Sequence, residues 1–146
     1  MAAEIVTTAE LLAYGRASGT LEEISDADTS PLDGAVAKAV DRVRQAALND
    51  YTAASFEALT AATAPPEMRD HTLAIALDAQ TKADGQRPDS IGIALSEAAQ
   101  WLRFLAGGTT HYDLSPGAVL VKRGTNSEVT YKSPARKFDD PWSVVP

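Results

Sequence analysis

The side chains best suited to proton transfer at neutral pH are two histidines, and neither lies in a pattern typical of an active site. His71 falls within an expected helix beside Asp70, whereas His111 precedes Tyr112 and Asp113 in an expected loop. General acid–base catalysis requires groups that converge in one pocket, and this spacing indicates no convergence. We therefore expect no catalytic residues and a protein that is not an enzyme.

Cofactor and metal sites are not indicated either. The sequence contains no glycine-rich phosphate loop, no His-Glu-x-x-His pair, no nucleophile elbow and no aspartate-rich calcium loop, and it has no Cys. Asp139 and Asp140 are adjacent carboxylates, but no further oxygen ligands follow at the spacing of a calcium loop. We expect no cofactor and no metal ligand.

The C-terminal stretch 134–146 combines large apolar side chains with prolines and has no helical periodicity. Burying such a side chain stabilises the chain by roughly 1.5 to 3 kcal/mol. Two locations offer that burial, the chain's own body or a partner protein. We favour a partner whose acidic groove attracts Arg136 and Lys137. The candidate partner-binding residues are Arg136, Lys137, Phe138, Trp142, Val144 and Val145.

Helices are expected to position these features. Capping residues, N-terminal prolines and closing glycines predict helices over residues 8–15, 32–53, 65–84 and 90–106. The helix over 65–84 has apolar residues on more than one face, which favours a central and buried position. In the last helix, Trp101 and Phe104 widen the apolar stripe, so we expect both in the core.

The second of these helices has the clearest apolar spacing. Val36, Val40, Val43, Ala47 and Tyr51 recur at intervals of three and four residues, which predicts one buried face.

Beyond the helices, two β-prone runs at 118–123 and 128–132 flank a Gly/Asn turn, which predicts a hairpin. The expected fold is mainly α, with a small four-helix bundle-like body, a C-terminal β-hairpin and an extended tail. The boundaries are a helical body over 1–115, the hairpin over 116–133 and the tail over 134–146.

Composition is consistent with one alanine-rich domain. The chain has 146 residues and a net charge of −7, and 27 of its residues are Ala, which favours closely packed helices. Residues 1–115 carry a net charge of −9 and residues 116–146 carry +2. An acidic body argues against a dedicated nucleic-acid binder. We also expect a soluble protein, because no apolar run reaches the length of a membrane span.

Several short segments resemble a known family in their order along the chain. These segments are the Thr-x-Glu-Leu-Leu start at 8–12, the Ala-Ala-Leu-Asn-Asp-Tyr run at 46–51, the Pro-Pro helix start with Ile-Ala at 75–76, the amphipathic helix 94–106 and the Ser-Pro-Ala-Arg-Lys-Phe ending at 133–138. Together they are similar to the head-completion or head-to-tail connector (adaptor) proteins of tailed bacteriophages, in particular the Mu-like group.

This resemblance implies a structural virion protein of the neck, assembled in the host cytoplasm. Such connectors form a closed ring of about twelve copies, which requires two different surfaces on each subunit. The implied partners are the portal protein, further copies of the chain and a tail-side neck or stopper protein, while DNA passes through the channel and no membrane is involved. The alternative is a small helical interaction module that uses its tail as a peptide ligand.

Overall fold

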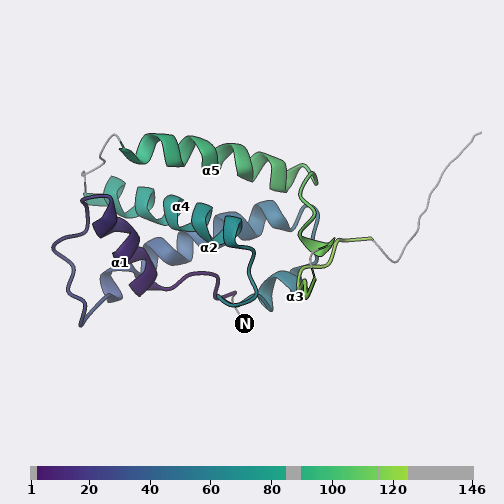
Figure 1. The fold of residues 1–146 in the computed structure, drawn as a ribbon, viewed down its shortest axis with the longest axis horizontal. Helices are drawn as coiled ribbons and strands as arrows, with labels where there is room; N and C mark the ends of the chain where they lie inside the picture. Colours follow the sequence, from purple (N-terminus) through teal and green to yellow (C-terminus); the bar gives the residue numbers. More distant parts are fainter. Residues whose placement is uncertain (1–2, 85–89, 115, 125–146) are drawn as a thin grey trace, which may run out of the picture.

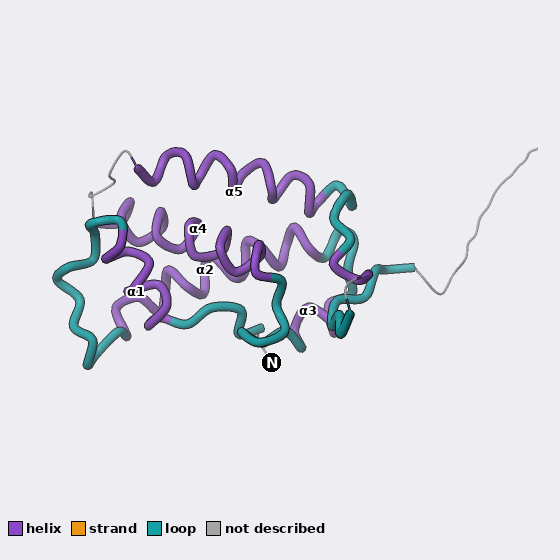
Figure 2. Tube along the Cα trace, in the orientation of Figure 1, coloured by secondary structure: helices purple, strands orange, loops and turns teal. Residues whose placement is uncertain are grey.

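Helices dominate the part of the chain that the computed structural model describes, residues 3–84, 90–114 and 116–124. Figure 2 shows helices and loops and no strand among these residues. The mainly helical prediction is confirmed. The helices are α1 (Thr8–Ala17), α2 (Asp33–Ala47, preceded by a 3-10 turn at Ser30–Leu32), α3 (Ala53–Glu57), α4 (Pro66–Asp84) and α5 (Ser90–Ala106), followed by a 3-10 turn at Tyr112–Leu114.

Helix α4 is the centre of the body, as its sequence predicted. It packs against α1, α2 and α5, which lie around it in Figure 1. Its buried side chains include two threonines, whose hydroxyls donate within the helix: Thr72 to the Met68 carbonyl (2.6 Å) and Thr81 to the Leu77 carbonyl (2.9 Å). These bonds satisfy the hydroxyls, so polar residues fit inside the apolar centre.

Helix α1 begins where predicted but ends later. The Thr7 hydroxyl accepts the Glu10 N–H, and the Glu10 carboxylate accepts the Thr7 N–H, which is a complete capping box. Gly15 does not stop the helix: it is buried within α1, and the chain turns instead at Gly19, where φ is +79°. Leu21, itself at a φ of 61°, covers Gly15 with its side chain.

This close packing makes Gly15 sensitive to substitution. A methyl group there would lie 2.7 Å from Leu21 Cγ and 3.2 Å from Leu77 Cδ1, so Gly15→Ala is expected to destabilise the fold by about 1 to 3 kcal/mol. The matched control is Gly92→Ala in α5, where nothing lies within 4 Å and a gain of about 0.5 to 1 kcal/mol is expected. Urea unfolding followed by circular dichroism measures both. A shift of the two midpoints in the same direction would contradict this packing.

The face that helix α2 presents to the core differs only in part from the predicted one, since Val43 and Ala47 are buried as predicted. Ala35, Ala39, Val43 and Ala47 are buried, whereas Val36 and Val40 lie at the edge of that stripe and are half-buried. Small alanine side chains let α2 approach α4 closely, which rotates the two valines outwards. The helix also ends at Ala47 rather than near residue 53.

The chain after α2 turns and forms α3, a short helix that the sequence analysis missed. The Thr52 hydroxyl caps it by accepting the Ser55 N–H at 3.3 Å. Tyr51 remains fully buried, although it lies outside a helix.

Helix α5 confirms one expected core residue and contradicts the other. Trp101 is 4% exposed, whereas Phe104 is 49% exposed. Ile93 is also exposed, at 72%. The side of α5 that faces away from α4 therefore carries apolar side chains in solvent.

The predicted hairpin is not present in the described residues. Residues 116–124 contain no strand, and Lys122 forms a single antiparallel bridge with Tyr51 instead. The first arm of the predicted hairpin, residues 118–123, thus bonds to the turn after α2, where Thr52 donates to the Val121 carbonyl and Asp50 accepts from the Arg123 N–H. The second arm, 128–132, lies outside the described residues.

Candidate interaction site

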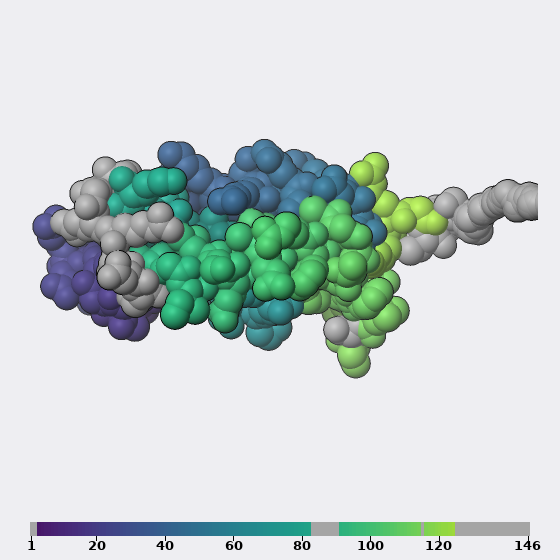
Figure 3. All heavy atoms as spheres, turned by 90° about the horizontal axis from the view of Figure 1, so that it is seen from above, coloured from purple at the N-terminus to yellow at the C-terminus, as the bar shows by residue number. Residues whose placement is uncertain are grey.

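The candidate site is the end of the bundle where residues 116–124 join the helical body. Figure 3 shows this segment at the opposite end of the body from α1. Three backbone N–H groups fix it there: Thr52 donates to the Val121 carbonyl (2.9 Å), Arg123 to the Asp50 carbonyl (2.7 Å) and Val121 to the Ser55 hydroxyl (3.1 Å). Residues 121–123 therefore have a defined position against the body.

Tyr51 is the buried anchor of this end. Its hydroxyl accepts the Tyr112 N–H (3.0 Å) and hydrogen-bonds to the Thr110 hydroxyl (2.9 Å), so it joins the turn after α2 to the loop after α5. Its ring lies 5.2 Å from the Lys122 ammonium, a cation–π contact. One side chain thus connects three segments that are distant in sequence.

Lys122 is held by charge as well as by the ring. It forms an ion pair with Asp50 and donates to the Gly108 carbonyl at 3.2 Å. Burial lowers the pKa of Lys122, but the hydrogen bond and charge of Asp50 outweigh that effect, so the pKa is raised. The ammonium is therefore a structural cation and not a base at neutral pH.

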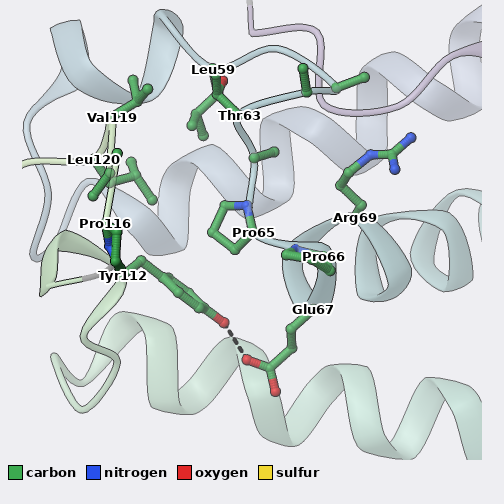
Figure 4. A pocket seen from close by; sticks show the side chains of 15 residues that line it. Leu59, Thr63, Pro65, Pro66, Glu67, Arg69, Tyr112, Pro116, Val119 and Leu120 are labelled. Carbon is green, nitrogen blue, oxygen red and sulfur yellow. Dashed lines mark hydrogen bonds between the residues drawn. The ribbon is translucent and has the colours of Figure 1, made fainter.

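Tyr112 makes the second connection, between α4 and α5. Its hydroxyl accepts the Trp101 indole N–H (2.7 Å) and donates to the Glu67 carboxylate (Figure 4). Burial and the hydrogen bond to Glu67 raise the pKa of Tyr112 above its ordinary value. The phenol stays protonated at neutral pH and acts as a hydrogen-bond bridge.

A pocket of about 430 Å³ lies beside Tyr112, between the start of α4 and the segment 116–120. Figure 4 shows the hydrogen bond between Glu67 and Tyr112 and the Arg69 side chain pointing away from Tyr112. Arg69 pairs with Glu10 and donates to the Ile5 carbonyl at 2.9 Å. Both charged side chains that line the pocket, Glu67 and Arg69, therefore already have partners.

The hydroxyl of Tyr112 should contribute measurably to stability. Tyr112→Phe keeps the ring and removes both hydroxyl bonds, so we expect a loss of about 1 to 2 kcal/mol at pH 7. The raised pKa of Tyr112 means that its contribution is complete below about pH 10, the unfolded pKa, and is lost as the pH rises towards the folded pKa. Urea unfolding at pH 7 and pH 11 checks this. If the two proteins differ by the same free energy of unfolding at pH 7 and at pH 11, this role of the Tyr112 hydroxyl is contradicted.

The structure does not join the two histidines into one site. The His71 ring stacks on Trp101 with centroids 5.0 Å apart, and His111 is exposed in the loop after α5. In the residues that the structure describes, no group of three or more His, Asp or Glu could hold a metal ion. No helix in the described ranges is long and apolar enough to cross a bilayer.

The predicted partner-binding residues in the tail, Arg136, Lys137, Phe138, Trp142, Val144 and Val145, lie outside the described residues, as do Asp139 and Asp140. The sequence analysis missed the roles of Tyr51 and Tyr112, because Tyr51 acts through partners about sixty residues away and the Tyr112 hydroxyl binds Glu67, which is 45 residues away. It also missed an apolar groove of about 630 Å³ beside α2. The signal for that groove was present in Val36 and Val40, which form a second stripe next to the alanines.

Comparison with known proteins identifies no relative: no protein-family model, no curated protein and no solved structure matches the chain. The function is therefore argued from the arrangement described above and from the resemblance of the short segments.

Proposed function

We propose that the chain is a structural connector of a tailed-phage neck, which forms a ring beneath the portal and extends the DNA channel towards the tail. The observation that carries the proposal is the fixed position of residues 120–124 at one end of the helical body. A tail that starts from the same point in every subunit gives each copy of Phe138 and Trp142 the same reach towards the portal. Copies arranged in a ring then bind a ring-shaped portal with multiplied avidity.

Ring formation is supported by two different apolar surfaces on one subunit. One is the outer side of α5, with Ile93 and Phe104 exposed, and the other is the groove beside α2. A closed ring requires that one surface of each subunit meets a different surface of the next. The net charge of −9 over residues 1–115 also suits a channel through which DNA passes without binding.

We propose that the predicted hairpin forms only when the subunits assemble. A two-stranded hairpin is marginal in water, and residues 118–123 already pair in part with the turn after α2. We infer that residues 128–132 add to this arm when neighbouring subunits cover it.

Deletion of residues 134–146 tests the portal contact. The full chain is expected to co-sediment with purified portal rings encoded beside it, and the truncated chain is expected to stay in the supernatant with an unchanged far-UV circular dichroism spectrum. The control is Glu22→Gln, an exposed change outside the tail that should co-sediment normally. Normal binding by the truncated chain would contradict the assignment of the tail.

Light scattering distinguishes the alternative, a small interaction module. If the full chain stays monomeric both alone and with portal rings, the module is favoured and the connector is rejected.

A further inference from the structure

The groove beside α2 is a recess lined by both apolar and acidic residues. Its floor consists of residues from the N-terminal segment and from one side of α2, namely Ala3, Val6, Val36, Ala37 and Val40. Its volume of about 630 Å³ is in the range of pockets that bury drug-sized ligands, so it can accept an aromatic side chain. Val36 and Val40 remain half-buried because nothing in the described residues covers them.

The rim of this groove is acidic. Four carboxylates line it, those of Glu4, Asp33, Asp41 and Glu57, and the one cation of the lining, Arg44, is already bound by Glu57 (Nε to Oε2, 3.1 Å). Three carboxylates, those of Glu4, Asp33 and Asp41, remain beyond the Arg44–Glu57 pair, and an apolar floor with such a rim fits a segment that places cations next to large apolar side chains.

The chain itself contains such a segment. Residues 136–145 begin with two adjacent cations, Arg136 and Lys137, and contain four large apolar side chains, Phe138, Trp142, Val144 and Val145. Asp139 and Asp140 bring the net charge of the segment to zero, so only its first two residues suit the acidic rim. We propose that the α2 groove binds residues 136–145 of the same chain, with Arg136 and Lys137 against the acidic rim and the apolar side chains on the floor.

The point where the described chain ends favours the groove of the same molecule. The Arg123 guanidinium donates to the Leu48 carbonyl at 2.6 Å, so the chain departs beside the C-terminal end of α2. The groove runs along α2 from Arg44 back to Asp33, about 17 Å at 1.5 Å per residue. Arg136 follows Gly124 by twelve positions, a stretch that spans up to about 40 Å when extended. The segment therefore reaches every part of the groove without a second molecule.

This contact belongs to the isolated chain and does not depend on a portal. Only its consequence rests on the proposed connector function: a portal would take the same residues from the groove, so free subunits keep their apolar tail covered until assembly. The test is accordingly made without a portal, and its result is independent of whether the chain is a connector.

Disulfide trapping in the full chain tests the contact, because the natural sequence has no Cys. Ala37 is exposed in the groove and Ser143 adjoins Trp142, so the variant Ala37→Cys/Ser143→Cys is oxidised mildly at micromolar concentration. The matched control is Gln100→Cys/Ser143→Cys, with its first cysteine exposed on α5. We expect the groove pair to form an intrachain bond about tenfold faster than the control pair, because bound segments have a higher effective concentration.

Gel electrophoresis without reductant and intact mass separate the outcomes. A monomeric, oxidised groove pair supports the proposal, and the added changes Arg136→Glu and Lys137→Glu should slow its formation severalfold. Equal rates for the two pairs would overturn the proposal. Linked dimers as the main product would also overturn it, because they would place the segment in a second copy.

A second measurement guards against a cysteine variant that perturbs the groove. A nitroxide spin label on Ser143→Cys alone should broaden the methyl signals of Val36 and Val40 and leave that of Ile93 on α5 sharp. Unaffected valine signals, or equal broadening of all three residues, would reject the contact.

Discussion

Portal binding is expected to fall by roughly a thousandfold when Phe138 and Trp142 are both replaced by alanine, because two interface anchors of about 2 kcal/mol each are removed. The measurement is the affinity of the full-length variant for immobilised portal rings. The far-UV circular dichroism spectrum should not change, since neither residue lies in a described helix. The affinity of the variant for the portal should still fall as the salt concentration rises, because Arg136 and Lys137 are retained.

The matched control for this variant is Ser133→Ala/Ser143→Ala, which changes the same region without removing an apolar side chain. Its affinity should stay within about twofold of the natural chain's, because surface substitutions away from anchors cost little. Equal losses in the two variants would show that the contact depends on the backbone of the tail and not on its aromatic residues.

The second large effect concerns stability. Tyr51→Ala is expected to destabilise the fold by about 3 to 5 kcal/mol, because it empties a fully buried aromatic site. It also leaves the Tyr112 N–H without its acceptor and removes the ring that lies against Lys122. Urea unfolding measures the loss, and hydrogen exchange at the Arg123 amide should become faster, since its acceptor is the neighbouring Asp50 carbonyl.

The control is Tyr51→Phe, which keeps the ring and loses only the hydroxyl bonds, at a cost of about 1 kcal/mol. A cost for Tyr51→Ala that is no larger than this would contradict the account of Tyr51 as the anchor of the bundle end.

Local sequence signals located most of the helices, because caps and apolar periodicity act over a few residues. The Thr7 capping box and the start of α4 at Pro66 follow the pattern directly. Gly15 did not end α1 as expected. It lies within the helix, and the side chain of Leu21 packs across it. The extent of α2 also depended on tertiary contacts: Tyr51 is buried by the loop after α5 rather than by a continued helix.

The two apolar surfaces, the α2 groove and the outer side of α5, could be predicted only in part, because they too depend on tertiary contacts. The acidic rim and apolar floor of the α2 groove come from Glu4, Val40 and Glu57, which no short motif brings together. Phe104 was expected in the core from its place on an amphipathic stripe, but the stripe is wider than the surface that α4 and α2 cover. An apolar side chain that the fold leaves exposed is visible only once the neighbouring helices are placed.

Electron cryomicroscopy of purified portal rings mixed with an excess of the full chain measures assembly itself. Helical subunits should occupy one face of the portal, one for each portal subunit, and join side to side around the channel. Portal rings that remain bare under conditions where the chain is folded and in excess would show that it does not act as a connector.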